Sequence, residues 1–76
     1  MINNKYDLLK FLIANMDAKT QRFNDTDLKL LNMLGGEKLS EYLTELKTEE
    51  FIKVYLNSEI LINVKAIEFI RKLYNI

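Results

Sequence analysis

The sequence predicts a single mainly α-helical domain of the α+β class with one β-hairpin. Apolar residues recur at helical spacing before residue 48, and the pattern then changes at residues 51–56 (FIKVYL), where β-branched and aromatic side chains gather. Helical spacing returns after Asn63. The expected order is therefore helix, helix, helix, strand, strand, helix, and at 76 residues the chain has room for one domain, spanning 1–76.

The first helix is expected over residues 5–16, because Asn4 is placed to cap it and apolar residues follow at helical spacing. Leu8 and Phe11 widen its apolar arc beyond the single stripe of a surface helix. This helix is therefore either central in the core or covered by another chain. The polar residues 17–24 form a connection, with a short extended piece at 22–24.

A second helix begins where Asn24 or Thr26 can cap it, and it continues through Leu34. Gly35 and Gly36 are the only glycines in the chain, and a left-handed C-cap at this point would end the helix.

The third helix is expected over residues 37–47. Leu39, Tyr42, Leu43 and Leu46 share its inward face, while the opposite face is acidic and hydroxylated.

The predicted hairpin consists of residues 51–56, a turn at 57–59, and residues 60–64 (ILINV). Because side chains alternate along a strand, Ile52, Val54 and Leu56 form the candidate core face. A buried helix is the competing interpretation for 60–64.

The last helix begins after Asn63, which can cap it, and runs to about Tyr74 with one apolar half and one polar half. The apolar half of this helix can pack either against the rest of the same chain or against a second copy in a twofold interface. We expect a homodimer, and the candidate interface residues are Leu8, Phe11, Phe69, Leu73 and Tyr74.

The amino-acid composition excludes several classes of catalytic and metal-binding site. The chain has no cysteine and no histidine, which leaves catalysis and metal binding to carboxylates alone, and the acidic pairs fit helix starts and turns better. We therefore expect no catalytic residue, no metal and no cofactor. No apolar run reaches the roughly 18 residues of a membrane span, so a cytoplasmic protein without a membrane partner is expected.

Residues 62–70 read INVKAIEFI. This segment resembles the pattern Ile-Thr-Leu-Lys-Gly-Ile-Glu-Phe-Leu that leads from the second wing strand into the final helix of small bacterial and phage winged-helix proteins, including the YjcQ-like group. Asn63 stands where threonine is usual, and Ala66 stands where glycine is usual. The resemblance implies a winged helix-turn-helix fold in the order α1-α2-α3-β-β-α4.

The resemblance also implies a transcriptional regulator of a phage, a mobile element or an AT-rich bacterium that binds duplex DNA. Helix three would enter the major groove, and basic side chains would meet the DNA backbone. The candidate DNA-binding residues are Arg22, Lys38, Ser40, Thr44, Lys47 and Lys53.

Charge argues for an alternative function. With 11 basic and 11 acidic residues the net charge is zero, and Glu37, Glu41 and Glu45 lie on or near the presented face of helix three. The alternative is a protein-interaction module, an inhibitor of a host protein that uses this acidic face.

Overall fold

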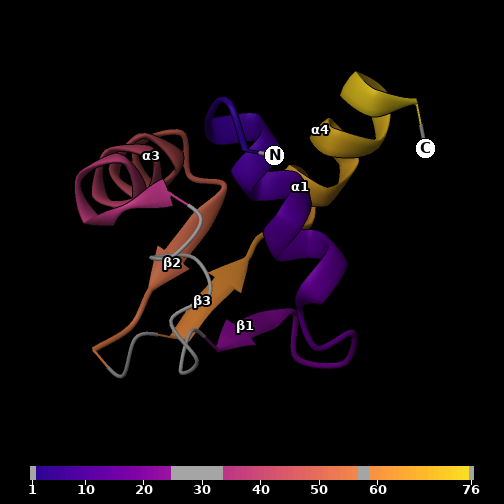
Figure 1. Cartoon of the computed structure of the whole chain (residues 1–76). Helices are drawn as coiled ribbons and strands as arrows, with labels where there is room; N and C mark the ends of the chain where they lie inside the picture. The colour runs from indigo at the N-terminus through magenta and orange to yellow at the C-terminus, as the bar shows by residue number, and fades with distance from the viewer. Residues whose placement is uncertain (1, 25–33, 57–58, 76) are drawn as a thin grey trace.

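The computed structural model describes residues 2–24, 34–56 and 59–75, which form three helices and a three-stranded antiparallel sheet (Figure 1). The elements are α1 (Lys5–Asn15), β1 (Arg22–Asn24), α3 (Gly36–Thr48), β2 (Ile52–Val54), β3 (Glu59–Ile62) and α4 (Val64–Tyr74). The α+β class is confirmed. The predicted order is corrected, because β1 follows the first helix, and the predicted second helix falls on residues 25–33, outside the described residues.

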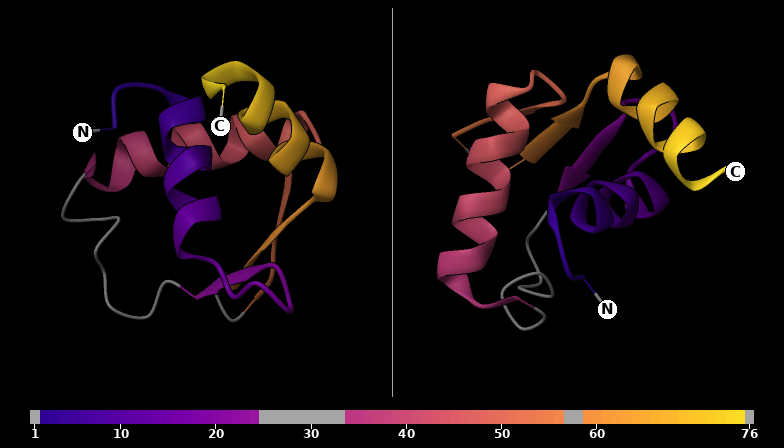
Figure 2. Two further views of the ribbon diagram at one scale, coloured as in Figure 1. Left: turned by 90° about the vertical axis from the view of Figure 1, so that its right-hand side faces the viewer. Right: turned by 90° about the horizontal axis from the view of Figure 1, so that it is seen from above.

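Helix α1 lies between α3 and α4, and its lower end reaches the sheet (Figures 1 and 2). The Asn4 side chain accepts hydrogen bonds from the backbone N–H groups of Tyr6 and Asp7, each at 2.9 Å, which confirms the predicted cap. Leu8, Leu9 and Leu12 have no exposed surface. The wide apolar arc of α1 is therefore covered by the chain's own core.

The strand order in the sheet is β1-β3-β2, so the last strand in sequence is the central one. In the register, Phe23 of β1 is opposite Ile60 of β3, and Ile52 of β2 is opposite Ile62. All four of these side chains are buried. The predicted single hairpin is thus part of a larger sheet, because the buried Phe23 anchors residues 22–24 against β3.

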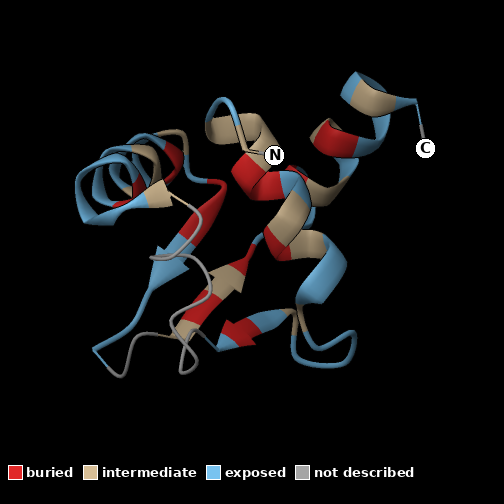
Figure 3. Cartoon of the chain, viewed as in Figure 1, coloured by how far each residue is buried: buried red, intermediate tan, exposed pale blue. Residues whose placement is uncertain are grey.

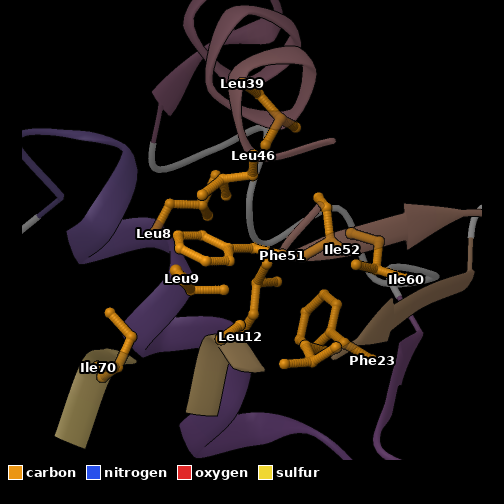
Figure 4. Close-up of a cluster of buried hydrophobic side chains, with 12 residues drawn as sticks. Leu8, Leu9, Leu12, Phe23, Leu39, Leu46, Phe51, Ile52, Ile60 and Ile70 are labelled. Atoms are coloured by element: carbon orange, nitrogen blue, oxygen red, sulfur yellow. The ribbon is translucent and has the colours of Figure 1, made fainter. Parts of the chain in front are cut away.

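The core lies where α1, α3, α4 and one face of the sheet meet (Figure 3). Phe51 lies among Leu8 and Leu9 of α1 and Leu46 of α3 (Figure 4). The predicted core face of the hairpin is buried at Ile52, whereas Val54 is exposed although it is opposite the buried Ile60.

Val54 and Leu56 are exposed, whereas Phe51 is buried. Glu50, with φ 63°, turns the chain immediately before Phe51, so Phe51 lies outside the alternation of the strand, and β2 ends at Val54, before Leu56.

Gly35 has φ 78° and ψ 155°, which is not the predicted left-handed helical conformation, and the helix that it was predicted to end lies outside the described residues. The residue instead stands at the N-cap position of α3, in a backbone region that is essentially restricted to glycine. Apart from its chain neighbours, no heavy atom of the described residues lies within 4 Å of the position that a Cβ would occupy, and the backbone conformation alone favours glycine.

Helix α4 is held at both ends. The Asn63 side chain accepts from the N–H of Lys65 and donates to the carbonyl of Glu50, so it caps α4 as predicted and also ties the helix to the turn before β2. At the other end the Tyr74 hydroxyl donates to a carboxylate oxygen of Asp7 at 2.6 Å. This bond joins α4 to the first turn of α1.

Candidate nucleic-acid interface

The candidate DNA-contacting residues of α3 lie along its exposed side, and Lys38, Ser40, Thr44 and Lys47 are all exposed. The last three line a hollow of about 240 Å³ beside Val54 of β2. The hydroxyl and amine groups of this helix therefore face an accessible surface. That position suits contact with base edges or phosphates.

The sheet contributes a second set of basic residues. Leu61 of β3 is opposite both Arg22 of β1 and Lys53 of β2. Directly paired residues point to the same side of an antiparallel sheet, and the neighbouring Phe23 and Ile60 point into the core. Arg22, Leu61 and Lys53 therefore form one row on the outer sheet face, the side of the sheet opposite the core.

Arg22 is partly engaged within this row. Its guanidinium lies 3.4 Å from a carboxylate oxygen of Glu59 and 5.0 Å from the centre of the Tyr55 ring. Lys53 and Lys47 differ from it, because neither ammonium group has an ion pair within the described part of the chain. Both lysines are exposed, so their ammonium groups are available to an external anion.

Lys47 and Lys53 lie at the same groove, which has a volume of about 550 Å³ and is formed where α3, the sheet and α4 meet. We call this hollow the lysine groove; its lining residues are Gln21, Lys47, Glu50, Ile52, Lys53, Leu61, Asn63 and Val64. Two of them, Gln21 and Glu50, have positive φ angles of 57° and 63°. Such strained non-glycine residues cluster at functional sites.

Two of the three candidate acidic residues of α3 lie close to lysines. Glu45 lies 3.6 Å from the Lys5 ammonium of α1, and Glu41 lies 3.8 Å from Lys38 on its own helix. Glu37, Glu41 and Glu45 are all exposed. Part of their charge is nevertheless balanced within the chain, so α3 does not present three unopposed carboxylates.

Glu49, at the C-terminal end of α3, links this helix to α1 by an ion pair and a hydrogen bond. Its carboxylate lies 2.9 Å from the Lys5 ammonium and accepts from the Tyr6 hydroxyl, also at 2.9 Å. Burial acts to raise the pKa of Glu49, but the hydrogen bonds from Lys5 and Tyr6 outweigh it and hold that pKa below its ordinary value. The same contacts raise the pKa values of Lys5 and Tyr6.

The candidate dimer residues have different environments. Leu8 is fully buried in the core, while Phe11, Phe69 and Tyr74 are half-buried and pack against it. Only Leu73, at 51% exposure, presents a large apolar surface. The dimer interface stays a prediction.

Sequence reasoning missed several residues of the lysine groove. Gln21, Leu61 and Val64 were not candidates, because their positions depend on the pairing of β1 with β3 and on the start of α4. The positive φ of Glu50 has no sequence signal either, since glutamate seldom adopts that conformation.

Comparisons with protein families, curated proteins and solved structures found no match. Within residues 2–24, 34–56 and 59–75, no cluster of acidic side chains has the arrangement of a metal site. In the same ranges, no helix has the length and hydropathy needed to cross a membrane.

Proposed function

We propose that the chain is a small winged-helix DNA-binding protein and acts as a transcriptional regulator. Helix α3 would serve as the recognition helix, and the hairpin of β2 and β3 as the wing. The glycine turn at Gly35, helix α3, the hairpin and α4 follow one another in the sequence as the resemblance implies. This order supports the proposal.

The observation that carries the proposal is the pair Lys47 and Lys53. They come from different elements, they line one groove, and within the described residues neither has an ion pair. Arg22 extends the same surface along the outer sheet face. Separate cations on one surface are suited to successive phosphates of a DNA backbone.

The alternative, a protein-interaction module that uses the acidic face of α3, has weaker support. Lys5 and Lys38 lie close to two of its three glutamates, which lowers the negative potential available to a basic partner. A host protein as target therefore ranks second.

Fluorescence anisotropy with a labelled DNA duplex tests the proposal. Affinity should fall steeply as salt is raised, and Lys53→Glu or Arg22→Glu should weaken binding across sequences. Loss of one phosphate contact should reduce the slope of log affinity against log salt by about 1. Lys72→Glu, on the exposed side of α4, is the matched control and should bind nearly as the unchanged protein does.

Absence of binding at about 50 mM salt would contradict the proposal. Equal losses in Lys53→Glu and Lys72→Glu would also contradict it, because binding would then follow net charge rather than this surface. Sedimentation of the free protein and of the DNA complex tests the homodimer separately.

A further inference from the structure

The lysine groove has a feature that DNA-backbone contact does not require. Beside the two lysines, its lining includes the apolar side chains of Ile52 of β2, Leu61 of β3 and Val64 of α4. Val64 is 53% exposed and Leu61 is half-buried, so these two side chains are open to solvent, whereas Ile52 is buried in the core. A phosphate contact needs cations and hydrogen-bond donors, whereas an apolar lining stabilises the burial of carbon.

The polar groups of the groove define the charge of a ligand. Lys47 and Lys53 supply two positive charges and Glu50 one negative charge, which leaves the lining with a net charge of +1. Asn63 is already engaged, because its side chain caps α4 and bonds to the Glu50 carbonyl. The lysines are therefore the principal groups for binding an anion.

The backbone gives independent support. Gln21 and Glu50 are two of the three non-glycine residues with positive φ in the described chain, and both line this groove. These two strained residues line a concave site of about 550 Å³, a volume typical of small-molecule pockets.

We propose that the lysine groove binds a small amphipathic carboxylate, with the carboxylate between Lys47 and Lys53 and the hydrocarbon part on Leu61 and Val64. The ligand would compete with DNA, because it occupies two lysines assigned to phosphate contacts. The competition rests on the proposed function, whereas binding of the ligand does not. The groove would thus make DNA binding sensitive to a free metabolite.

Three probes separate the contributions to binding. Octanoate carries both the charge and the hydrocarbon chain, octanol carries the chain without the charge, and acetate carries the charge without the chain. We expect octanoate to shift the NMR signals of Leu61 and Val64 with a dissociation constant on the order of millimolar. Octanol and acetate should each bind at least about tenfold more weakly.

Substitutions locate the site. Lys47→Gln and Lys53→Gln should each weaken octanoate binding about twofold to fivefold, as expected for solvent-exposed charge contacts. Lys72→Gln is the matched control and should leave the affinity unchanged. Equal affinity for octanoate and acetate, or for octanoate and octanol, would overturn the proposal, as would shifts confined to residues outside the groove.

The competition is measured by adding octanoate to the complex of protein and labelled duplex at constant ionic strength. DNA should be released with a midpoint that follows the octanoate affinity, and an equal concentration of acetate should release much less. Octanoate that occupies the groove while DNA stays bound would overturn the proposal. A protein that binds octanoate in the groove but never binds DNA would contradict the proposed function and leave the ligand site supported.

Discussion

The Tyr74–Asp7 hydrogen bond is expected to contribute measurably to stability, and Tyr74→Phe removes it while keeping the ring. The hydroxyl lies 2.6 Å from a charged acceptor, and such bonds contribute about 1.5–3 kcal/mol when buried. Both side chains are half-buried, so solvent screening lowers the expected loss to about 1 kcal/mol. For a domain of this size that loss corresponds to a fall in Tm of about 4–8 °C.

The same bond predicts how stability depends on pH. It raises the pKa of Tyr74 from 10.0 to about 12, so its stabilising contribution is full below pH 10.0 and is lost as the pH rises toward 12. The hydrogen bond from Tyr74 also lowers the pKa of Asp7. The Asp7 contribution is therefore present above the ordinary aspartate pKa and is lost as the pH falls through the lowered value.

Thermal and urea denaturation followed by circular dichroism would measure the loss at neutral pH, and NMR titration of the tyrosine rings would measure the pKa. Tyr55→Phe is the matched control, because within the described residues the Tyr55 hydroxyl makes no hydrogen bond. If the two variants unfold at the same temperature, or if Tyr74 ionises near pH 10.0 in the unchanged protein, the account of this bond is refuted.

Three further substitutions test the local structure. Gly35→Ala should destabilise the fold by about 1–3 kcal/mol in chemical denaturation, because alanine is strained at φ 78° and ψ 155°, and an unchanged midpoint would contradict that backbone conformation. Asn63→Ala should cost about 1 kcal/mol through loss of the α4 cap, with Asn3→Ala as the control, because the exposed Asn3 side chain makes no hydrogen bond within the described residues. Glu49→Gln should lower stability at neutral pH and make stability less sensitive to acid. The pKa of Glu49 is lowered in the fold, so its carboxylate stabilises the protein at pH values above the ordinary glutamate pKa and this contribution is lost in acid. Identical dependence of stability on acid pH in the two proteins would exclude this role.

Local signals predicted much of the fold. Asn4 and Asn63 are caps whose side chains bond within the next few residues, and the apolar spacing of α1, α3 and α4 is a property of each segment alone. The pairing of β1 with β3 joins residues 22–24 to residues 59–61, and no local pattern encodes a contact at that separation. The burial of Phe51 likewise depends on α1 and α3.

In the candidate interface, too, the sequence indicated the residue types but not their arrangement in space. Lys47, Lys53 and Arg22 were identifiable as basic residues near the predicted third helix and hairpin. Their arrangement was not, because the row of Arg22 and Lys53 exists only through Leu61 in the central strand. The pairing of Glu45 with Lys5 was also not predictable, since it joins residues forty positions apart on different helices.

The central position of β3 determines when the sheet can form during synthesis. Both other strands are made earlier, yet in the described sheet each of them pairs with β3. Until residues 59–62 have left the ribosome, Phe23 and Ile52 lack the strand against which they are buried. A nascent chain that stalls before this point would expose apolar side chains and unpaired strand edges, which are the features that chaperones and proteases recognise.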